Sequence, residues 1–366
     1  MVLSRLFIVT CISVCILGRK HYKFLSLQLN DDIYGKSFFS GKMECDGVCN
    51  PDNHNNGESN NWIGYSIRKY RIVDKLGEGA SACVYKVKNT ETMIESALKI
   101  SKNEFSEKNI VNMAQEVKVL KAIEERDPEN RAPILKMEEC FMHEGKQCMI
   151  FPLMGKTLAS FMENPKFRFS GFQREHIQRI GYQIFQALHF LHQNGISHRD
   201  LKSDNIMFTN LEPIAEYNYE LQNFITDKNN QEIRLIDVGL ARFDFQNYND
   251  KDNDIWDAGL VLFKMWCGED LFFNKKEIVQ HVLCPAPVEF AASNPNGVFD
   301  ASFNQRRSVY SKLKPLDMYR GLDGHPDPQF LHLIRGLLEF RADMKNSASF
   351  AMQHPYFEGM AQIYGD

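Results

Sequence analysis

The stretch SHRDLKSDNIMF, residues 197–208, places a carboxylate, an ammonium group and a carboxamide within six consecutive positions. The carboxylate of Asp200 can accept a proton from a hydroxyl group or orient that group. The side-chain oxygen of Asn205 can bind a hard cation such as Mg²⁺, and Lys202 can offset negative charge on a neighbouring group. The stretch therefore predicts a site for polar chemistry on an anionic molecule.

The residues that follow supply a second acidic group and then an apolar helix. LIDVGLA, residues 235–241, offers Asp237 as a further oxygen ligand, and 31 residues lie between Asn205 and Asp237. IWDAGLVLFKMW, residues 255–266, is apolar nearly all round, which is typical of a helix in the centre of a helical lobe. Asp254, which lies directly before that helix, comes only seventeen positions after Asp237.

Upstream, LGEGASACV, residues 76–84, carries Gly77 and Gly79 in a glycine-rich turn. Glycines allow backbone N–H groups to approach phosphate oxygens without a Cβ in the way, but glycines at this spacing also form ordinary hairpin turns. Lys99 follows in the apolar segment ALKI, where a lysine more often faces solvent at an edge. A Lys99 side chain that points inward needs a carboxylate, and Glu116 is available on the next helical segment.

The pattern of apolar residues divides the chain into a β-rich part and a helical part. Alternation of apolar and polar residues predicts strands around the glycine-rich turn and in SALKI and QCMIF. Helical spacing occurs in NMAQEVKVLKAI and, as one continuous apolar stripe, in EHIQRIGYQIFQALHFLH. The sequence therefore predicts an α+β fold in which a small β-rich lobe precedes a larger, mainly helical lobe.

The composition of the 366-residue chain, with 43% hydrophobic and 25% charged residues, is that of a globular protein. The net charge of −4 provides no basic excess of the kind that nucleic-acid binders usually show. The nine cysteines include no C-x-x-C pair, so neither a zinc site nor a disulfide scaffold is predicted. We expect no direct nucleic-acid partner, and free thiols in a reducing compartment.

The first 69 residues differ in character from the rest of the chain. Residues 1–18 include about a dozen mostly apolar residues in a row, which suits a signal peptide or anchor. A disordered tail or a wrongly assigned start is the alternative, and membrane contact is expected only if the segment is a real anchor. Residues 19–69 are rich in Asn, Asp, Gly and Ser and are predicted to form a low-complexity linker.

Together these motifs resemble the eukaryotic protein kinase family from about Tyr70 to Met360. The spacing H-R-D-L-x-x-x-N at residues 198–205 matches the catalytic loop of that family. The resemblance implies a bilobed kinase fold over residues 70–360, and it implies ATP and Mg²⁺ as cofactors. The expected parts are an N-lobe at 70–151, a hinge at 152–154 and a C-lobe at 155–360.

The resemblance also implies a role for each matching residue. Asp200 is expected to face the substrate hydroxyl, and Lys202 to offset charge on the transferred phosphate. Lys99 and Glu116 are expected to form the ion pair that holds the α- and β-phosphates. The implied metal ligands are Asn205 and Asp237, and the implied ATP-binding residues are Leu76, Gly77, Glu78, Gly79, Ala80, Val84, Ala97, Lys99, Phe151, Pro152, Met154 and Met207.

Further segments narrow the resemblance to the LAMMER kinases, which phosphorylate splicing factors. The long stretch between Asn205 and Asp237 is similar to an extended hairpin of that family, and LEFRADMKNSASFAMQHPYFEGM is similar to its last segment. The family's own signature is expected near residues 274–285, where only Leu283 and Pro285 match well. The chain is therefore identified as a divergent member, which implies Ser/Thr acceptors in Arg/Ser-rich proteins, with Tyr as an alternative acceptor.

The short stretch from Asp237 to Asp254 departs from the family. It has about half the usual length of an activation segment and lacks the A-P-E motif of the substrate platform. The buried Arg that pairs with the A-P-E glutamate in the family is also replaced, by Lys345. Losing one member of a buried ion pair is far more destabilising than losing both, which favours divergence over an error in the gene model. Val238 in place of Phe is a milder change.

Two functional interpretations follow from these departures. The first is an ATP- and Mg²⁺-dependent protein kinase, supported by the survival of every polar catalytic position. The second is a nucleotide-binding pseudokinase or scaffold, supported by the missing platform. We expect a monomer located in the nucleus or cytoplasm, or in the secretory pathway or at a membrane if residues 1–18 are a targeting segment.

Overall fold

The computed structural model describes residues 62–79, 81–102, 107–163, 172–211, 215–218, 223–226, 231–243, 248–271, 316–321, 324–338 and 347–365. All of them belong to one unit that begins at Trp62. Several features of interest lie outside the described residues: the apolar segment 1–18, Ala80 of the glycine-rich turn, residues 274–285 and Lys345.

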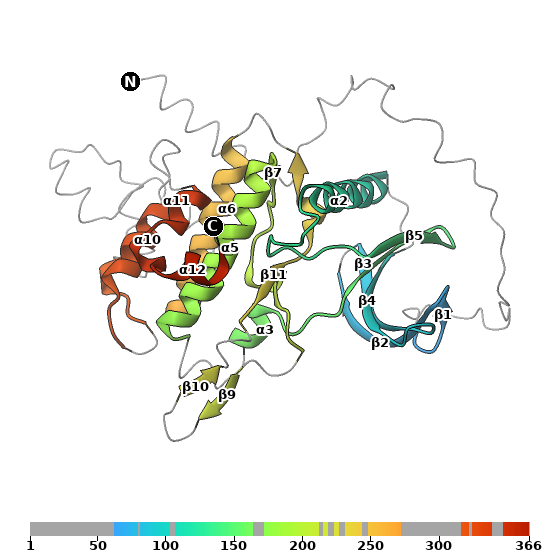
Figure 1. Cartoon of the computed structure of the whole chain (residues 1–366), viewed down its shortest axis with the longest axis horizontal. Coiled ribbons are helices and arrows are strands. Elements are labelled where there is room, and N and C mark those ends of the chain that lie inside the picture. Colours follow the sequence, from blue (N-terminus) through green and yellow to red (C-terminus); the bar gives the residue numbers. More distant parts are fainter. Residues whose placement is uncertain are drawn as a thin grey trace, which may run out of the picture. The chain divides into compact units, whose positions relative to one another are not determined.

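Six antiparallel strands form the sheet of the N-lobe, in the order β1-β2-β3-β4-β6-β5 (Figure 1). In β4, Ser96, Leu98 and Ile100 are buried while the residues between them are more exposed, the alternation expected of a strand with one face on a core. The strands are β1 (Ser66–Ile67), β2 (Tyr70–Glu78), β3 (Ala82–Asn89), β4 (Glu95–Ser101), β5 (Glu139–His143) and β6 (Lys146–Pro152). One long helix, α2 (Glu107–Arg126), follows β4.

The folded region begins before Tyr70, so the predicted linker, residues 19–69, does not extend as far as residue 69. Ile67 of β1 pairs with Tyr70 of β2, and both side chains are buried in the core of the sheet. The ring of Trp62 lies against Lys146, whose Nζ is 4.3 Å from the ring centroid. Residues 62–69 therefore belong to the folded N-lobe, with Ser66–Ile67 in its sheet. A two-residue strand is too short for alternation to predict it.

Two long helices form the centre of the C-lobe, α5 (Arg174–Gln193) and α6 (Tyr248–Cys267). The predicted apolar stripe of α5 is confirmed, since Ile177, Ile180, Ile184, Leu188 and Leu191 are all buried. A Cβ on Gly181 of α5 would lie 2.9 Å from Leu262 Cδ2 of α6, so this glycine allows the two helices to approach closely. The shorter helices are α3 (Leu158–Met162), α10 (Pro328–Leu337), α11 (Ala348–Met352) and α12 (Met360–Tyr364).

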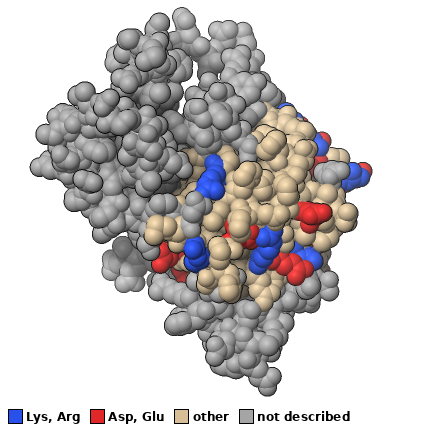
Figure 2. Space-filling view, turned by 90° about the vertical axis from the view of Figure 1, so that its left-hand side faces the viewer, with Lys and Arg blue, Asp and Glu red and all other residues tan. Residues whose placement is uncertain are grey.

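Helices α10, α11 and α12 lie on the side of the C-lobe seen in Figure 2, where uncharged residues cover most of the described surface. Residues 347–365 contain a single charged side chain, that of Glu358. None of the helices in the described residues is long and apolar enough to cross a bilayer.

The remaining strands form three short pairs. The long stretch between Asn205 and Asp237 leaves as β8 (Ile206–Phe208), forms the hairpin β9 (Ala215–Asn218) and β10 (Asn223–Thr226), and returns as β11 (Ile233–Leu235). After Asp237 come η3 (Val238–Leu240) and β12 (Arg242–Phe243), which pairs with β7 (Ile196–Ser197). Helix α6 begins at Tyr248, so only four positions separate β12 from α6.

Candidate active site

The pairing of β8 with β11 brings Asn205 and Asp237 together. Asn205 directly precedes β8 and Asp237 follows β11, and in an antiparallel pair these two ends lie side by side. The backbone N–H of Ile236 donates a hydrogen bond to Asn205 O at 2.9 Å. Asp237 itself has a left-handed backbone with φ of 60°, which turns the chain as it leaves β11.

Lys99 points into the junction and not toward solvent at a strand edge. Its Nζ donates to Glu116 Oε1 at 2.6 Å and to Asp237 Oδ1 at 3.2 Å. The Glu116 side chain is 7% exposed and that of Lys99 is 18% exposed. The structure therefore joins three candidate residues from β4, α2 and the turn after β11 in one ionic contact.

Burial and ion pairing shift the pKa values of Lys99 and Asp237 in opposite directions. Burial alone would lower the pKa of Lys99, but the negative charges of Glu116 and Asp237 outweigh burial and raise it. Burial alone would raise the pKa of Asp237, but the ammonium group of Lys99 outweighs burial and lowers it. Lys99 is therefore a cation and Asp237 an anion at neutral pH, the states required to bind phosphate and metal.

Asp200 lies at the centre of a second cluster. Lys202 Nζ donates to Asp200 Oδ2 at 2.7 Å, a hydrogen bond that raises the pKa of Lys202. Asn205 Nδ2 donates to the backbone oxygen of Asp200 at 2.8 Å and to its Oδ2 at 3.0 Å. The carboxylate of Asp200, the candidate catalytic group, is thus held through Oδ2, and Oδ1 is the oxygen left to face a hydroxyl group.

The same contacts test whether the site suits Mg²⁺. The amide nitrogen of Asn205 is used on Asp200, so the amide oxygen is the atom left to bind a cation. Asp237 uses Oδ1 on Lys99 and can offer Oδ2. Two oxygen ligands from the protein, completed by phosphate and water, are the donor set that Mg²⁺ uses in phosphoryl-transfer sites, so these residues fit the ion.

A fully buried carboxylate, Asp254, anchors the catalytic loop to α6. Its Oδ2 accepts the backbone N–H of His198 at 2.8 Å, and its Oδ1 accepts that of Arg199 at 2.7 Å. His192 Nε2 lies 2.9 Å from Asp254 Oδ2. Arg199 has a left-handed φ of 68°, and the two hydrogen bonds hold the backbone in this strained form. Sequence reasoning identified Asp254 only as the start of a helix and missed this function.

The imidazole of His198 lies between Asp200 and the residue that precedes Asp237. The backbone N–H of Asp200 donates to His198 Nδ1 at 3.3 Å, so the proton of the neutral ring is on Nε2. That atom lies 3.2 Å from Ile236 O and donates to it. The imidazole therefore links the catalytic loop to the residue that precedes Asp237.

Several of the residues expected to bind ATP come from four neighbouring strands of the N-lobe, β2, β3, β4 and β6. Gly77 pairs with Val84, and Ala97 pairs with Phe151. Met207 of β8 forms an isolated bridge with Thr157, directly after the hinge. Among the other candidates, Leu76, Glu78 and Gly79 are exposed, Pro152 and Met154 are half-buried, and Phe151 is buried.

Sequence reasoning also missed Gly155, at the end of the hinge. Its backbone N–H donates to Phe208 O at 2.8 Å. A Cβ at this position would lie 1.9 Å from the backbone oxygen of Asn210, so no other residue fits without moving the backbone. The only signal in the sequence is a lone glycine after an apolar strand.

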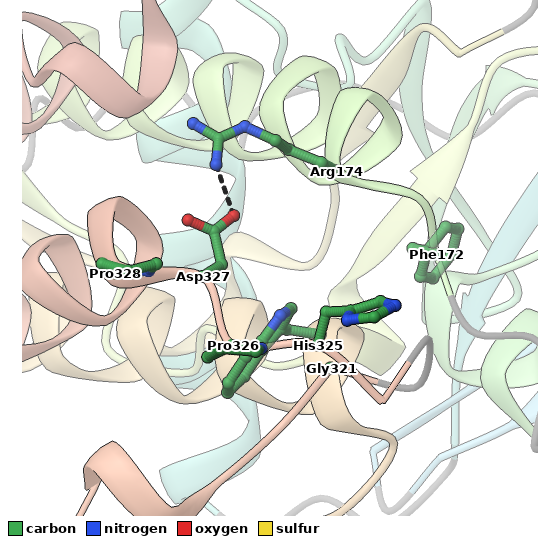
Figure 3. A pocket seen from close by; sticks show the side chains of 8 residues that line it. Phe172, Arg174, Gly321, His325, Pro326, Asp327 and Pro328 are labelled. Carbon is green, nitrogen blue, oxygen red and sulfur yellow. Dashed lines mark hydrogen bonds and ion pairs between the residues drawn. The ribbon is translucent and has the colours of Figure 1, made fainter.

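A separate cavity of about 230 Å³ lies in the C-lobe, at the N-terminal end of α5 (Figure 3). The ion pair of Arg174 with Asp327, at 2.5 Å, forms one wall. The full lining consists of Phe172, Arg174, Trp266, Gly321, His325, Pro326, Asp327 and Pro328. No candidate catalytic or ATP-binding residue is among them, so this cavity is distinct from the site.

Comparison with known proteins agrees with this geometry. Residues 70–247 match the family model described as protein kinase domain. The chain is 26% identical over 323 residues to mouse dual specificity protein kinase CLK4, covering 79% of this chain and 66% of that protein. It is 25% identical over 327 residues to Drosophila melanogaster serine/threonine-protein kinase Doa, covering 79% of this chain and 39% of that protein.

The chain thus spans two thirds or less of the length of these relatives. A solved crystal structure of a kinase domain superposes with a TM-score of 0.62 at 20% identity, covering 81% of this chain and 99% of that one, which confirms the bilobed fold. Residues 70–247 therefore belong to the protein kinase domain family, in a chain that is a divergent relative of the LAMMER-type kinases.

Proposed function

We propose that this chain transfers the γ-phosphoryl group of Mg·ATP to Ser or Thr hydroxyl groups of proteins, with Tyr as a further acceptor. The observation that carries the proposal is the position of Lys99 Nζ, 2.6 Å from Glu116 and 3.2 Å from Asp237. A lysine in this place can hold the α- and β-phosphates, while Asp237 would hold a Mg²⁺ ion beside them.

In the proposed reaction the substrate oxygen bonds to the γ-phosphorus, the bond to the bridging oxygen breaks, and ADP leaves. Asp200 orients the hydroxyl group through Oδ1 and takes its proton. Lys202, fixed on the same carboxylate at 2.7 Å, offsets the charge of the transferred group. Mg²⁺, when bound by Asn205 and Asp237, neutralises charge on the phosphate oxygens.

The substrate class rests on the relatives alone. Their names include both dual specificity and serine/threonine kinases, so we propose protein acceptors, with Arg/Ser-rich proteins as the first to test. We further propose a monomer that acts in the nucleus or cytoplasm, without direct contact with nucleic acid. Membrane or secretory localisation stays the alternative if residues 1–18 direct it.

A second candidate function is a nucleotide-binding pseudokinase. It is favoured by one observation, that α6 begins at Tyr248, with only four positions between it and the end of β12 at Phe243. In the family the substrate residue rests on a platform built between the corresponding points. A chain with so few residues there can bind Mg·ATP and still have no surface on which to position an acceptor.

Transfer of labelled γ-phosphate by the purified full-length chain separates the two functions. The acceptors are an Arg/Ser-rich peptide and the chain itself, and the variant is Asp200→Asn. We expect transfer by the unmodified chain and a loss of about 100-fold or more in the variant. Asp270→Asn, which removes an exposed carboxylate that pairs with Lys264 at 3.0 Å, should retain full activity. Nucleotide binding without transfer to any acceptor would establish the pseudokinase.

A further inference from the structure

The carboxylate of Glu78, between the two glycines of the turn, is held by two lysines. Its Oε2 accepts a hydrogen bond from Lys75 Nζ at 2.5 Å, within β2. Its Oε1 accepts a hydrogen bond from Lys102 Nζ. Lys102 directly follows β4, so this second contact connects the turn to a different strand. The two lysines lower the pKa of Glu78 to about 2, and the carboxylate is therefore charged at any working pH.

A backbone contact ties the turn to the same place. The N–H of Lys102 donates to Ser81 O at 2.9 Å, and the N–H of Gly79 closes the turn by donating to Ala82 O at 2.8 Å. Lys102 therefore contacts both sides of the turn. Its side chain binds Glu78 before the turn, and its backbone N–H binds Ser81 after it. The Lys86–Glu95 pair, at 2.7 Å, links β3 to β4 away from this place and contacts no part of the turn.

This arrangement compensates for the composition of the turn. Ala82 stands where a third glycine would be, and the turn carries no aromatic side chain at its tip to cover the phosphates. A loop that is ordered before binding loses less conformational entropy when it closes on a ligand. The contacts of Lys102 with Glu78 and Ser81 can order the turn in this way without a bulky side chain.

We propose that Glu78 and Lys102 form a latch that pre-orders the glycine-rich turn over the phosphates of ATP, an inference that rests on the proposed nucleotide site. Both are positioning residues, because they act through the backbone of the turn. The latch contributes to the binding of the phosphates and not to the binding of adenine or ribose.

The decisive variant is Glu78→Gln, because two explanations predict opposite results. Removing a negative charge from beside the phosphates would tighten binding if Glu78 acted only through its charge. If Glu78 is half of a latch, its removal frees the turn and weakens binding. Affinity for the Mg²⁺ complex of β,γ-methylene-ATP, which cannot donate its γ-phosphoryl group, is measured by calorimetry on the full-length chain, with adenosine as the ligand without phosphates.

We expect Glu78→Gln and Lys102→Met each to weaken binding of the triphosphate about two- to fivefold, with adenosine binding unchanged. The double variant should be no weaker than either single one, and Lys102→Arg should restore binding. The matched control is Glu95→Gln, whose side chain is 41% exposed against 43% for Glu78, and which should bind as the unmodified chain does.

Unchanged or tighter triphosphate binding by Glu78→Gln overturns the latch and leaves the proposed kinase untouched. Triphosphate binding that weakens as expected, in a chain that transfers no phosphate, supports the latch and removes only the proposed kinase. A chain that binds neither the triphosphate nor adenosine overturns both.

Discussion

Single residues fix the path of the chain where the two lobes meet. Gly155 follows the hinge, and the backbone that leaves β8 passes so close that a Cβ there would lie 1.9 Å from Asn210 O and 3.1 Å from Phe208 O. Both atoms belong to the backbone, so neither can rotate away as a side chain would. The hinge is therefore held against β8, which starts directly after Asn205, a proposed metal ligand.

We expect Gly155→Ala to destabilise the protein by about 2 kcal/mol or more, because the added methyl group forces the backbone apart in a packed region. The measurement is the free energy of unfolding from denaturant titration. Gly77→Ala is the matched control, since a Cβ at Gly77 meets no atom within 4 Å, and its stability should be nearly unchanged. Equal stability of the two variants would show that the hinge is not packed as described.

At the scale of elements, a histidine pair joins α10 to η5 (Pro355–Phe357). His332 Nδ1 and His354 Nε2 are 2.8 Å apart, and the rings are stacked with centroids at 5.1 Å. The backbone N–H of Tyr356 donates to His354 Nδ1 at 3.1 Å, so His354 carries its proton on Nε2 and donates it to His332. Both rings must be neutral to form this chain of hydrogen bonds.

The pair predicts a loss of stability in acid. Burial, together with His332, lowers the pKa of His354, so below pH about 6.5 the unfolded chain binds more protons than the folded protein. The stabilising contribution is complete above that pH and decreases as the pH falls. His354→Asn retains an N-cap for η5 but cannot titrate, so its denaturation midpoint should fall less than that of the unmodified chain between pH 7.5 and pH 5.5.

Other groups also titrate in this range and are the same in both proteins. The pKa of His189 is lowered by burial and by His192, and its contribution cancels when the two proteins are compared. A midpoint that shifts equally with pH in the variant and the unmodified chain would exclude the histidine pair as a source of pH dependence.

At the scale of the whole molecule, an ionic contact joins the two lobes. Lys99 comes from the sheet of the N-lobe, while Asp237 follows a strand of the C-lobe. The distance from Lys99 Nζ to Asp237 Oδ1 is 3.2 Å. A ligand that binds Lys99 and Asp237 at once binds only the folded arrangement. Nucleotide binding should therefore stabilise the protein as a unit.

We expect Mg·ATP at 100 times its Kd to raise the free energy of unfolding by about 2.7 kcal/mol. Asp237→Asn should lose the part of this increase that depends on Mg²⁺ and keep the part given by ATP with a chelator. Melting temperatures with ATP, with and without Mg²⁺, measure both parts, and Asp270→Asn serves as the control. The same Mg²⁺-dependent increase in Asp237→Asn would mean that another residue binds the metal.

The strands and helices that carry the site could be predicted from the sequence because their signals are local. The apolar stripe of α5 and the alternation in β4 are read within a few turns or residues, and the structure confirms both. The strand β1 could not be predicted, because two residues are too few to show alternation. The start of α6 at Tyr248 could not be predicted either, because its first residues, YNDKDN, contain no apolar face.

The sequence by itself determined that Asp200, Lys202 and Asn205, the proposed catalytic and metal-binding groups, lie together, because they fall within six positions. Only the tertiary structure decided that Lys99 points inward to Glu116 and that Asp254 holds the catalytic loop. These contacts join separate elements. Their free energy comes from burial and pairing across the fold, which no short window of sequence contains.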